Sequence, residues 1–480
     1  MTKTIEEKLT GKQRTLIMIP LLIGGFIAVL NDTILNVAFP QLESSLHVST
    51  STVQWLATAY MLTIGILVPA VAFLMETFTT KTMYLAAMTL FAIGTVGCGF
   101  SQSFPALLIF RIVQGAGTGM LVPIMTNTIL EIYPPAKRGT VIGASMVVII
   151  VAPAFGPTLS GLVLKYLNWH WLFFSILPVA LLAMIIGGIN LKNVSTLTKP
   201  KIDILSIVLS TIGFGGLIFG ICSIESMGFN TLVLVSLLCG IIGLILFSRR
   251  QFTLKQPMLE LRTFRYPMFT LGTIIMFIAF MIPFAVNIIL PTYMQNTLGL
   301  TPFTSGLAML PGGILCGVGT LLSGRFYDRI GAKPLLITGF ALLTATMLFL
   351  SHISASTLLV MIITMHICVN LGLSLISTPA QTNILNQLSR EENAHGVAIL
   401  NTAQQIAAAF GSSLFIGLMG AVQTRYISKI QNPGISQQHA AAVSGVDIAF
   451  TAALAITVIG LILSFFIMRR KKETSDTSRT

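Results

Sequence analysis

The charged segment Gly324-Arg-Phe-Tyr-Asp-Arg-Ile-Gly-Ala-Lys333 joins two long apolar stretches of this sequence. A weaker copy, Ala72-Phe-Leu-Met-Glu-Thr-Phe-Thr-Thr-Lys81, joins two others nearer the N-terminus. Each copy follows the second helix of a possible six-helix unit. Repeats of this kind are common in secondary transporters, whose binding site lies near the middle of the membrane between the repeats. The sequence therefore predicts two six-helix units with an inserted pair of helices between them.

The apolar stretches around these segments are long enough to cross a membrane. A bilayer core of about 30 Å needs about 20 helical residues, and charges inside it are costly. Only 9% of the 480 residues are charged and 54% are hydrophobic. We therefore predict an all-α integral membrane protein with fourteen spans, at 16–40, 52–75, 82–101, 104–126, 139–164, 170–191, 203–222, 231–248, 268–291, 304–327, 333–351, 355–380, 394–421 and 446–468.

The positive charges predict the orientation of these spans. Of the 28 Lys and Arg residues, all but Lys165, Arg425, Lys429 and Arg111 fall in the two tails or in alternate loops. Loops rich in Lys and Arg stay on the cytoplasmic side. We therefore expect both termini in the cytoplasm, and the net charge of +13 is mostly a signal of topology.

Several other classes of protein do not fit the sequence. A nucleic-acid partner would require a basic folded face with interleaved aromatic residues, and no such domain is predicted. The N-terminal tail has no cleavage-site pattern of a signal peptide. The cysteines lie in or at the ends of spans without CxxC spacing, which favours small core residues over disulfide or metal roles. No motif of a metal site, a phosphate loop or a nucleophile elbow is present.

Asp32 is the only carboxylate well inside a predicted span. Gly25, Ala28, Asp32 and Asn36 recur at steps of three and four residues, so one face of this helix is small and polar. That face must look into the bundle or into a water-filled cavity, because intramembrane acids are expensive and usually functional. We expect Asp32 to exchange protons; the alternative is a structural carboxylate permanently paired with a neighbour.

Arg111 is the only basic residue inside a span. Gly115 and Gly119 follow it at intervals of four residues, so the three lie on one face of the helix, and Gln114 lies beside that face. Glycines at that spacing let another helix approach closely. Arg111 and Asp32 are expected at a similar depth, so a direct or water-mediated coupling is plausible; a purely structural anchor is the alternative. His366 and Asn370 form a further polar pair, for which we favour ordinary hydrogen bonding between helices.

These motifs resemble the major facilitator superfamily, in its fourteen-span drug:proton antiporter branch. Asp32-Thr-Ile-Leu-Asn-Val-Ala-Phe-Pro40 is similar to the first-helix signature of that branch, and Arg111-Ile-Val-Gln-Gly-Ala-Gly-Thr-Gly119 to the fourth-helix motif of the superfamily. The fifth span resembles the antiporter motif at Pro153, Gly156, Pro157, Ser160 and Gly161. The first loop copy departs from the pattern, with Glu76 for the usual Asp and neither glycine, which puts its latch role in doubt.

The resemblance implies a 6 + 2 + 6 arrangement of helices that rocks around a central cavity, with the inserted pair peripheral. The expected parts are a cytoplasmic tail at 1–15, an N-terminal bundle at 16–191, inserted helices with flanking loops at 192–267, a C-terminal bundle at 268–468, and a second cytoplasmic tail at 469–480.

The resemblance also implies roles for individual residues. Asp32 would carry the proton and Arg111 would assist. A conformational latch on the cytoplasmic side is expected at Gly324, Asp328, Arg329, Gly331 and Lys333, with the Asp328 carboxylate favoured by the N-terminus of the following helix. The substrate cavity is expected to be lined by Asn36, Gln54, Tyr60, Gln114, Asn287, Tyr293, Asn401 and Gln404.

The function implied is a proton-coupled multidrug exporter of a bacterial plasma membrane, working as a monomer and without a cofactor, metal or nucleic-acid partner. Its substrates would be neutral, zwitterionic or monocationic lipophilic compounds, because one intramembrane acid can neutralise one charge. One alternative is a dedicated exporter of a single metabolite, lipid or signalling molecule on the same fold. A membrane receptor or enzyme would be expected to carry a soluble domain or a catalytic cluster, and neither is visible.

Overall fold

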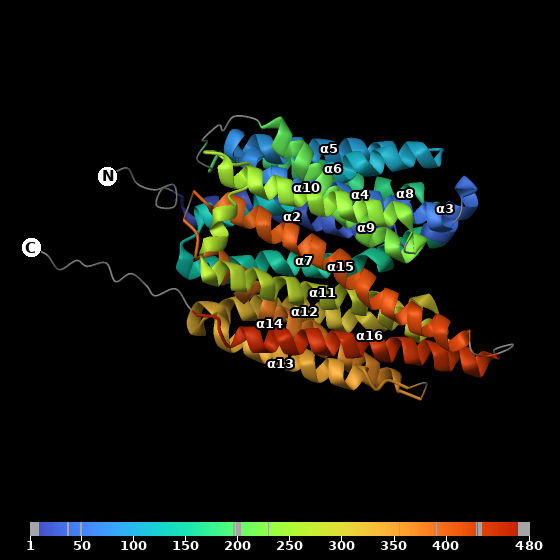
Figure 1. Ribbon diagram of the computed structural model, residues 1–480. Helices are drawn as coiled ribbons and strands as arrows, with labels where there is room; N and C mark the ends of the chain where they lie inside the picture. The colour runs from blue at the N-terminus through green and yellow to red at the C-terminus, as the bar shows by residue number, and fades with distance from the viewer. Residues whose placement is uncertain are drawn as a thin grey trace, which may run out of the picture.

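The computed structural model describes residues 9–35, 38–48, 50–194, 197, 203–228, 230–354, 356–389, 391–428, 430 and 434–468. All regular secondary structure in this part of the chain is helical (Figure 1). The long helices are α2 (Gly11–Ile34), α4 (Thr50–Thr77), α5 (Thr80–Phe100), α6 (Phe104–Ile132), α7 (Pro135–Tyr166), α8 (His170–Asn190), α9 (Ile204–Met227), α10 (Thr231–Thr253), α11 (Pro267–Asn296), α12 (Pro302–Ile330), α13 (Ala332–Leu350), α14 (Leu359–Leu385), α15 (Asn393–Ile427) and α16 (Ile435–Ser464). Two short helices, α3 (Phe39–Leu46) and η2 (Leu261–Arg265), lie between them.

Each predicted span corresponds to one of the long helices. By length and apolar composition, 12 helices of the described chain could cross a membrane, and a bent pair within α4, broken by 54° between Trp55–Leu67 and Ala70–Thr77, would be a thirteenth. The helix α7 is not among them. The all-helical membrane fold is therefore confirmed, whereas the count of fourteen spans and the orientation of the termini stay predictions.

Several boundaries differ from the predicted ones for a local reason. The helix α2 begins at Gly11 rather than at 16 because a capping box precedes it: Thr10 Oγ1 accepts from the Gln13 amide at 3.4 Å, and Gln13 Oε1 accepts from the Thr10 amide at 3.0 Å. The segment 324–333, expected as a loop, is almost entirely helix. Only Gly331 separates α12 from α13, and its φ of 85° lies in the region that glycine adopts without strain.

The helices form two groups with a long seam between them (Figure 1). The N-terminal helices are α2 and α4–α8, and the C-terminal helices are α11–α16. Across the seam α7 packs against α12, and α4 packs against α15. We call the end of the molecule where α2 begins and α16 ends the terminal face, and the opposite end the far face. The proposed division of the chain at 191 and 267 stays a prediction.

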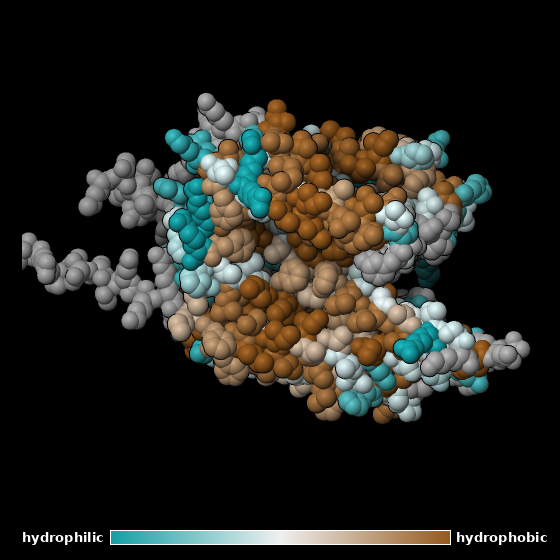
Figure 2. Space-filling view, in the orientation of Figure 1, coloured by the Kyte–Doolittle hydropathy of each residue, from teal (hydrophilic) through white to brown (hydrophobic). Residues whose placement is uncertain are grey.

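The surface has the pattern of a membrane protein. Figure 2 shows a broad hydrophobic belt across the middle of the molecule, with hydrophilic residues gathered toward the two ends. Large apolar side chains are exposed along α8, α10 and α13, for example Ile189, Leu234 and Phe349. Exposed apolar surface of this extent requires a hydrocarbon environment. The belt therefore marks the part of the helices that lies in the bilayer.

Candidate functional site

A cavity of about 420 Å³ lies in the seam between the two groups of helices. The molecule is hollowed there toward the far face (Figure 2). The lining is mostly apolar, with aromatic side chains and a few polar groups, as in sites for small molecules. The lining residues come from seven helices, α2, α3, α4, α6, α9, α11 and α15. They include Asp32, Phe39, Trp55, Thr58, Thr118, Ile218, Cys222, Phe280, Asn401, Gln404 and Gln405.

Asp32 is the one acidic residue that lines this cavity among those the structure describes. It lies in the last turn of α2, and its Oδ1 is buried without a hydrogen-bond partner. A buried polar atom without a partner is costly in a folded protein, and such atoms are concentrated at functional sites. An acid in contact with the cavity and with one oxygen unoccupied is placed to bind a proton or the cationic group of a ligand.

Arg111 lies fully buried in α6 behind the cavity wall. Its Nη1 donates to Gln114 Oε1 at 2.9 Å, its Nε donates to the Leu56 carbonyl at 3.4 Å, and its guanidinium lies 4.0 Å from the centre of the Tyr60 ring. The ring face stabilises the cation. In the described structure Arg111 makes no ion pair with Asp32, and its Nη2 has no hydrogen-bond partner. The positive charge is therefore held near the acid without being bonded to it.

A buried hydrogen-bond network connects α2, α4, α5 and α6 behind Asp32. The Tyr60 hydroxyl lies 2.7 Å from Thr118 Oγ1 and accepts from Asn31 Nδ2 at 3.4 Å. Gln114 Nε2 donates to Asn31 Oδ1 at 3.3 Å and to Thr95 Oγ1 at 2.8 Å. Tyr60 and Gln114, expected at the cavity surface, thus lie behind it, because these long polar side chains find partners only within the helix packing.

The opposite wall of the cavity carries neutral amides on α15. Asn401, Gln404 and Gln405 line it, and Gln404 Nε2 is buried without a hydrogen-bond partner. Asn401 donates to the Val397 carbonyl at 2.9 Å, which leaves its oxygen available to a ligand. The structure therefore brings Asp32, Asn401 and Gln404 to one cavity.

The remaining predicted cavity residues lie elsewhere. Tyr293 is buried and donates to the Ser354 carbonyl at 2.6 Å, and Asn287 contacts His366 at 3.4 Å, which in turn lies 3.0 Å from Asn370. Neither Tyr293 nor Asn287 lines the cavity. Asn36 and the side chain of Gln54 lie outside the described residues.

At the terminal face the seam between α7 and α12 is closed by glycines. A Cβ atom on Gly139 would lie 2.5 Å from Asp328 Oδ1, and one on Gly143 would lie 2.9 Å from the Thr320 carbonyl. A Cβ atom on Gly324 would meet the Gly139 carbonyl. The two helices therefore approach backbone to backbone, a packing that only small residues permit.

Asp328 bridges the same seam. Its Oδ2 accepts from the Thr140 amide at 3.0 Å and from the Thr140 hydroxyl at 2.5 Å. The carboxylate therefore forms its hydrogen bonds with α7. The sequence had suggested instead that it interacts with the N-terminus of the following helix. Arg325, Arg329 and Lys333 are exposed. The reason is that α12 runs on to Ile330, which directs Asp328 sideways into the seam.

A second bridge joins α4 to α15. Glu76 Oε1 lies 2.8 Å from His395 Nε2, and both side chains are largely buried. Nearby, Arg138 Nη1 donates to Asn386 Oδ1 at 3.1 Å, and Asn386 donates to the Tyr327 hydroxyl at 3.2 Å. The degenerate first segment thus also contacts the other half of the molecule. Sequence reasoning missed His395, because nothing local relates it to Glu76.

The antiporter motif on α7 lies next to the acid. A Cβ atom on Gly156 would meet Thr33 Oγ1 and would lie 3.3 Å from the Ile34 amide, so α7 contacts the residues that follow Asp32. Ser160 is fully buried, whereas a Cβ on Gly161 would meet nothing within 4 Å. The side chains of Pro153 and Pro157 lie outside the described residues. Gly156 is therefore a position of this motif at which α7 touches the helix that carries Asp32.

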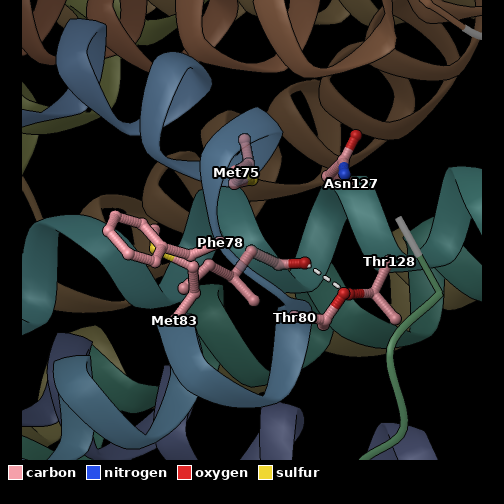
Figure 3. Close-up of a pocket in the computed structure, with 7 residues that line it drawn as sticks. Met75, Phe78, Thr80, Met83, Asn127 and Thr128 are labelled. Carbon is pink, nitrogen blue, oxygen red and sulfur yellow. Dashed lines mark hydrogen bonds between the residues drawn. The ribbon is translucent and has the colours of Figure 1, made fainter. Parts of the chain in front are cut away.

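A further hollow lies at the terminal face beneath the first segment (Figure 3). It is lined by Met75, Phe78, Thr80, Met83 and Asn127, and it encloses no measurable interior volume. The Thr128 hydroxyl donates a hydrogen bond to the Ile124 carbonyl at 2.7 Å. No cluster of three His, Cys, Asp or Glu side chains that could hold a metal occurs in the described part of the chain. The central cavity is the better candidate for binding.

Comparison with known proteins agrees with this geometry. A family model for the Major Facilitator Superfamily matches residues 21–412. The lincomycin resistance protein LmrB of Bacillus subtilis is 47% identical over 462 residues, covering 95% of this chain and 96% of that protein. The multidrug export protein EmrB of Escherichia coli is 28% identical over 338 residues, covering 70% and 66%.

A solved structure shows the same fold. The proton:xylose symporter XylE, bound to 6-bromo-6-deoxy-D-glucose, superposes with a TM-score of 0.65 at 15% identity, covering 96% of this chain and 97% of that one. At this identity the likeness concerns the fold alone. With a family model that covers most of the sequence and a relative of 47% identity along almost its whole length, this chain belongs to the Major Facilitator Superfamily of membrane transporters.

Proposed function

We propose that this transporter exports lipophilic compounds in exchange for protons, by exposing the central cavity alternately to the two sides of the membrane. The names of LmrB and EmrB support an exporter of drugs. The observation that supports proton coupling is Asp32, which faces the cavity with an unpartnered oxygen. The guanidinium of Arg111 lies behind it and keeps one nitrogen, Nη2, without a partner. We further infer that the terminal face is cytoplasmic, in agreement with the distribution of Lys and Arg.

In the proposed cycle Asp32 binds either a proton or the substrate. The observed conformation is open toward the far face, where a proton from the acidic exterior can reach Asp32 and displace a bound drug. The neutral carboxyl then allows the seam at the far face to close. After the terminal face opens, a new substrate enters and the proton leaves to the cytoplasm. Arg111 sits close enough to favour the charged carboxylate but is held by Gln114 and Tyr60, so it does not block the acid.

The lining of the cavity sets the substrate class. One acid can neutralise one positive charge, and a second buried charge without a partner would cost several kcal/mol. The amides on α15 can donate and accept hydrogen bonds but carry no charge. We therefore propose neutral, zwitterionic and monocationic lipophilic compounds as substrates, and poor export of divalent cations.

A pH gradient is sufficient to drive this exchange. One pH unit supplies about 1.4 kcal/mol per proton, equivalent to about tenfold accumulation. Exchange of one proton for one monocation moves no net charge, so only the pH gradient drives it. Export of a neutral compound moves one charge and also uses the membrane potential, at roughly 2.3 kcal/mol per 100 mV.

The decisive experiment compares the wild-type protein with Asp32→Asn in inverted membrane vesicles that have an imposed pH gradient and no membrane potential. Ethidium serves as the monocationic probe. We expect wild-type vesicles to accumulate ethidium and Asp32→Asn vesicles to show none, because no other acid among the described residues lines the cavity. Arg111→Lys should be partly impaired, because it keeps the charge but loses the planar group that binds Gln114 and stacks on Tyr60.

Accumulation of ethidium by Asp32→Asn vesicles under a pH gradient alone would contradict the assignment of the proton to Asp32. Wild-type vesicles that transport none of several lipophilic probes would instead favour the alternative, a dedicated exporter of one endogenous compound. Amounts of protein in the membrane, measured by immunoblot, must match between the variants.

A further inference from the structure

The inserted helix α9 contributes directly to the central cavity, although its position in the sequence suggested a peripheral role. Ile218, Cys222 and Ser223 line the cavity between α4 and α15. None of the described residues of α10, the other inserted helix, does so. The two members of the pair therefore have different surroundings, and only one of them can meet a bound molecule.

α9 is attached to both halves of the transporter. On the side of α4, the Phe219 ring lies 5.4 Å from the Trp55 ring, and Ile218 occupies the space beside Gly65, where a Cβ would meet its Cδ1. On the side of α15, the buried Ser413 hydroxyl donates to the Ile221 carbonyl at 2.8 Å. α9 thus fills the seam where α4 and α15 diverge toward the far face, and it closes the cavity on that side.

α10 covers the outer side of α9. The two helices touch through glycines, and a Cβ atom on Gly216 would lie 2.8 Å from the Ser236 carbonyl and 3.0 Å from the Gly240 amide. At the terminal face Arg250 forms two hydrogen bonds of 2.7 Å with Asp203, and this guanidinium lowers the pKa of the Asp203 carboxyl to about 2. The pair is therefore fixed as one hairpin, with α10 facing lipid and α9 facing the cavity.

The cavity surface of α9 differs in chemistry from the other two walls. Asp32 gives the wall of α2 a titratable charge, and Asn401 and Gln404 give the wall of α15 hydrogen-bonding amides. Ile218 and Cys222 offer an apolar, polarisable surface, with the small Ser223 beside them. A lipophilic substrate that places its charged or polar groups against the first two walls leaves its apolar part for the third.

We propose that α9 forms the third wall of the substrate cavity and, through Ile218 and Cys222, contacts the apolar part of the substrate and thereby limits which substrates fit. This inference rests on the proposed function for the identity of the substrate. The position of Cys222 at the water-filled cavity is a separate consequence that can be measured without any substrate.

The first measurement uses a chain in which only Cys222 is kept and the other four cysteines, Cys98, Cys239, Cys316 and Cys368, are replaced by Ala. A membrane-impermeant maleimide is added at the far face, and a matched chain that keeps only Cys239 serves as the control. Cys222 should be alkylated at least about tenfold faster than Cys239, because Cys239 is exposed on the lipid-facing α10. Equal rates, or an unreactive Cys222, would overturn the placement of α9 in the cavity wall.

The second measurement tests contact with the substrate. Cys222→Trp fills part of the cavity and should reduce pH-driven ethidium export by about tenfold, as expected for overpacking of a fitted site. Val208→Trp introduces the same side chain on the exposed side of the same helix and should leave export within about twofold, typical of a surface change. Equal effects of the two variants, with Cys222 alkylated rapidly, would mean that α9 borders the cavity but takes no part in selecting substrates.

The two hypotheses fail in different ways. If wild-type vesicles export no lipophilic probe, the proposed function is wrong, whereas rapid alkylation of Cys222 still supports α9 as a cavity wall. If wild-type vesicles export ethidium but Cys222 is unreactive, the function stands and the third wall is wrong.

Discussion

The two ends of the seam between the halves differ in how closely the helices pack. At the terminal face α7 and α12 touch through Gly139, Gly143 and Gly324, and Asp328 is hydrogen-bonded to Thr140. At the far face the seam opens into the cavity, where Asp32 and Gln404 each keep a buried polar atom without a partner. The closed end is held by contacts between the two halves, whereas the open end lines a cavity of about 420 Å³. A buried polar atom without a partner is not unique to the open end, since Asp328 Oδ1 at the closed end is another.

This difference predicts which residues affect binding and which affect the conformational change. The groups at the open end change partners in each cycle, so their replacement should affect coupling or affinity. The contacts at the closed end must form and break as a unit, so their replacement should affect the rate at which the transporter changes conformation. The three variants below test this division, in order of decreasing expected effect.

Gly156→Leu should cause the largest loss, because its side chain would collide with Thr33 beside Asp32. Overpacking of this kind costs about 1–3 kcal/mol, enough to reduce pH-driven ethidium export by about tenfold or more. Gly161→Leu is the matched control, since a Cβ there meets nothing within 4 Å. The protein should still elute as one peak from size-exclusion chromatography. Comparable activity of the two variants would show that close contact between α7 and α2 is not required.

Asp328→Asn should slow transport without weakening binding. The amide oxygen can take the place of Oδ2 and accept both hydrogen bonds from Thr140, but it carries no charge, and charge-assisted hydrogen bonds are the stronger ones. We expect the export rate to fall by about tenfold, equivalent to about 1.4 kcal/mol on the barrier. Ethidium affinity, measured by fluorescence titration, should stay within a few fold. A large loss of affinity with normal turnover would place Asp328 among the binding groups instead.

Glu76→Gln should have the smallest effect of the three. The glutamine can keep one hydrogen bond to His395 and removes the negative charge of the carboxylate. A hydrogen bond contributes roughly 0.5–1.5 kcal/mol and the glutamine retains it, so we expect at most a few-fold change in export rate. The double variant Glu76→Gln with Asp328→Asn is informative, because a loss much greater than the product of the two single effects would show that both bridges close the same face.

The sequence predicted the helices well because membrane spans are set by local composition. Runs such as 170–191 and 82–101 coincide closely with α8 and α5. Boundaries were less accurate where polar residues continue a helix, as at Gly11 and across 324–330, because hydropathy ends a span wherever charges begin. The capping box at Thr10 and Gln13 is a local signal from which the start of α2 could have been inferred.

The residues of the candidate site could be predicted when their residue type is rare inside a membrane. Asp32 and Arg111 stand out as isolated charges, and both lie at the site. Neutral polar residues are common in transporter helices, so Tyr293 and Asn287 could not be separated from Asn401 and Gln404 by type alone. Contacts between distant segments, such as Thr140 with Asp328 or Ser413 with Ile221, have no local signal and required the structure.

The attachment of α9 and α10 as one hairpin has an evolutionary consequence. The acid, the guanidinium behind it and the glycine seam all lie on other helices, so mutations in the hairpin can remodel the space offered to a compound without disturbing the energy source. Selection by a new toxic compound would therefore find tolerated changes at Ile218 and Cys222 sooner than around Asp32. Under the proposed mechanism, the recognition of substrates and the use of the proton gradient can diversify at different rates.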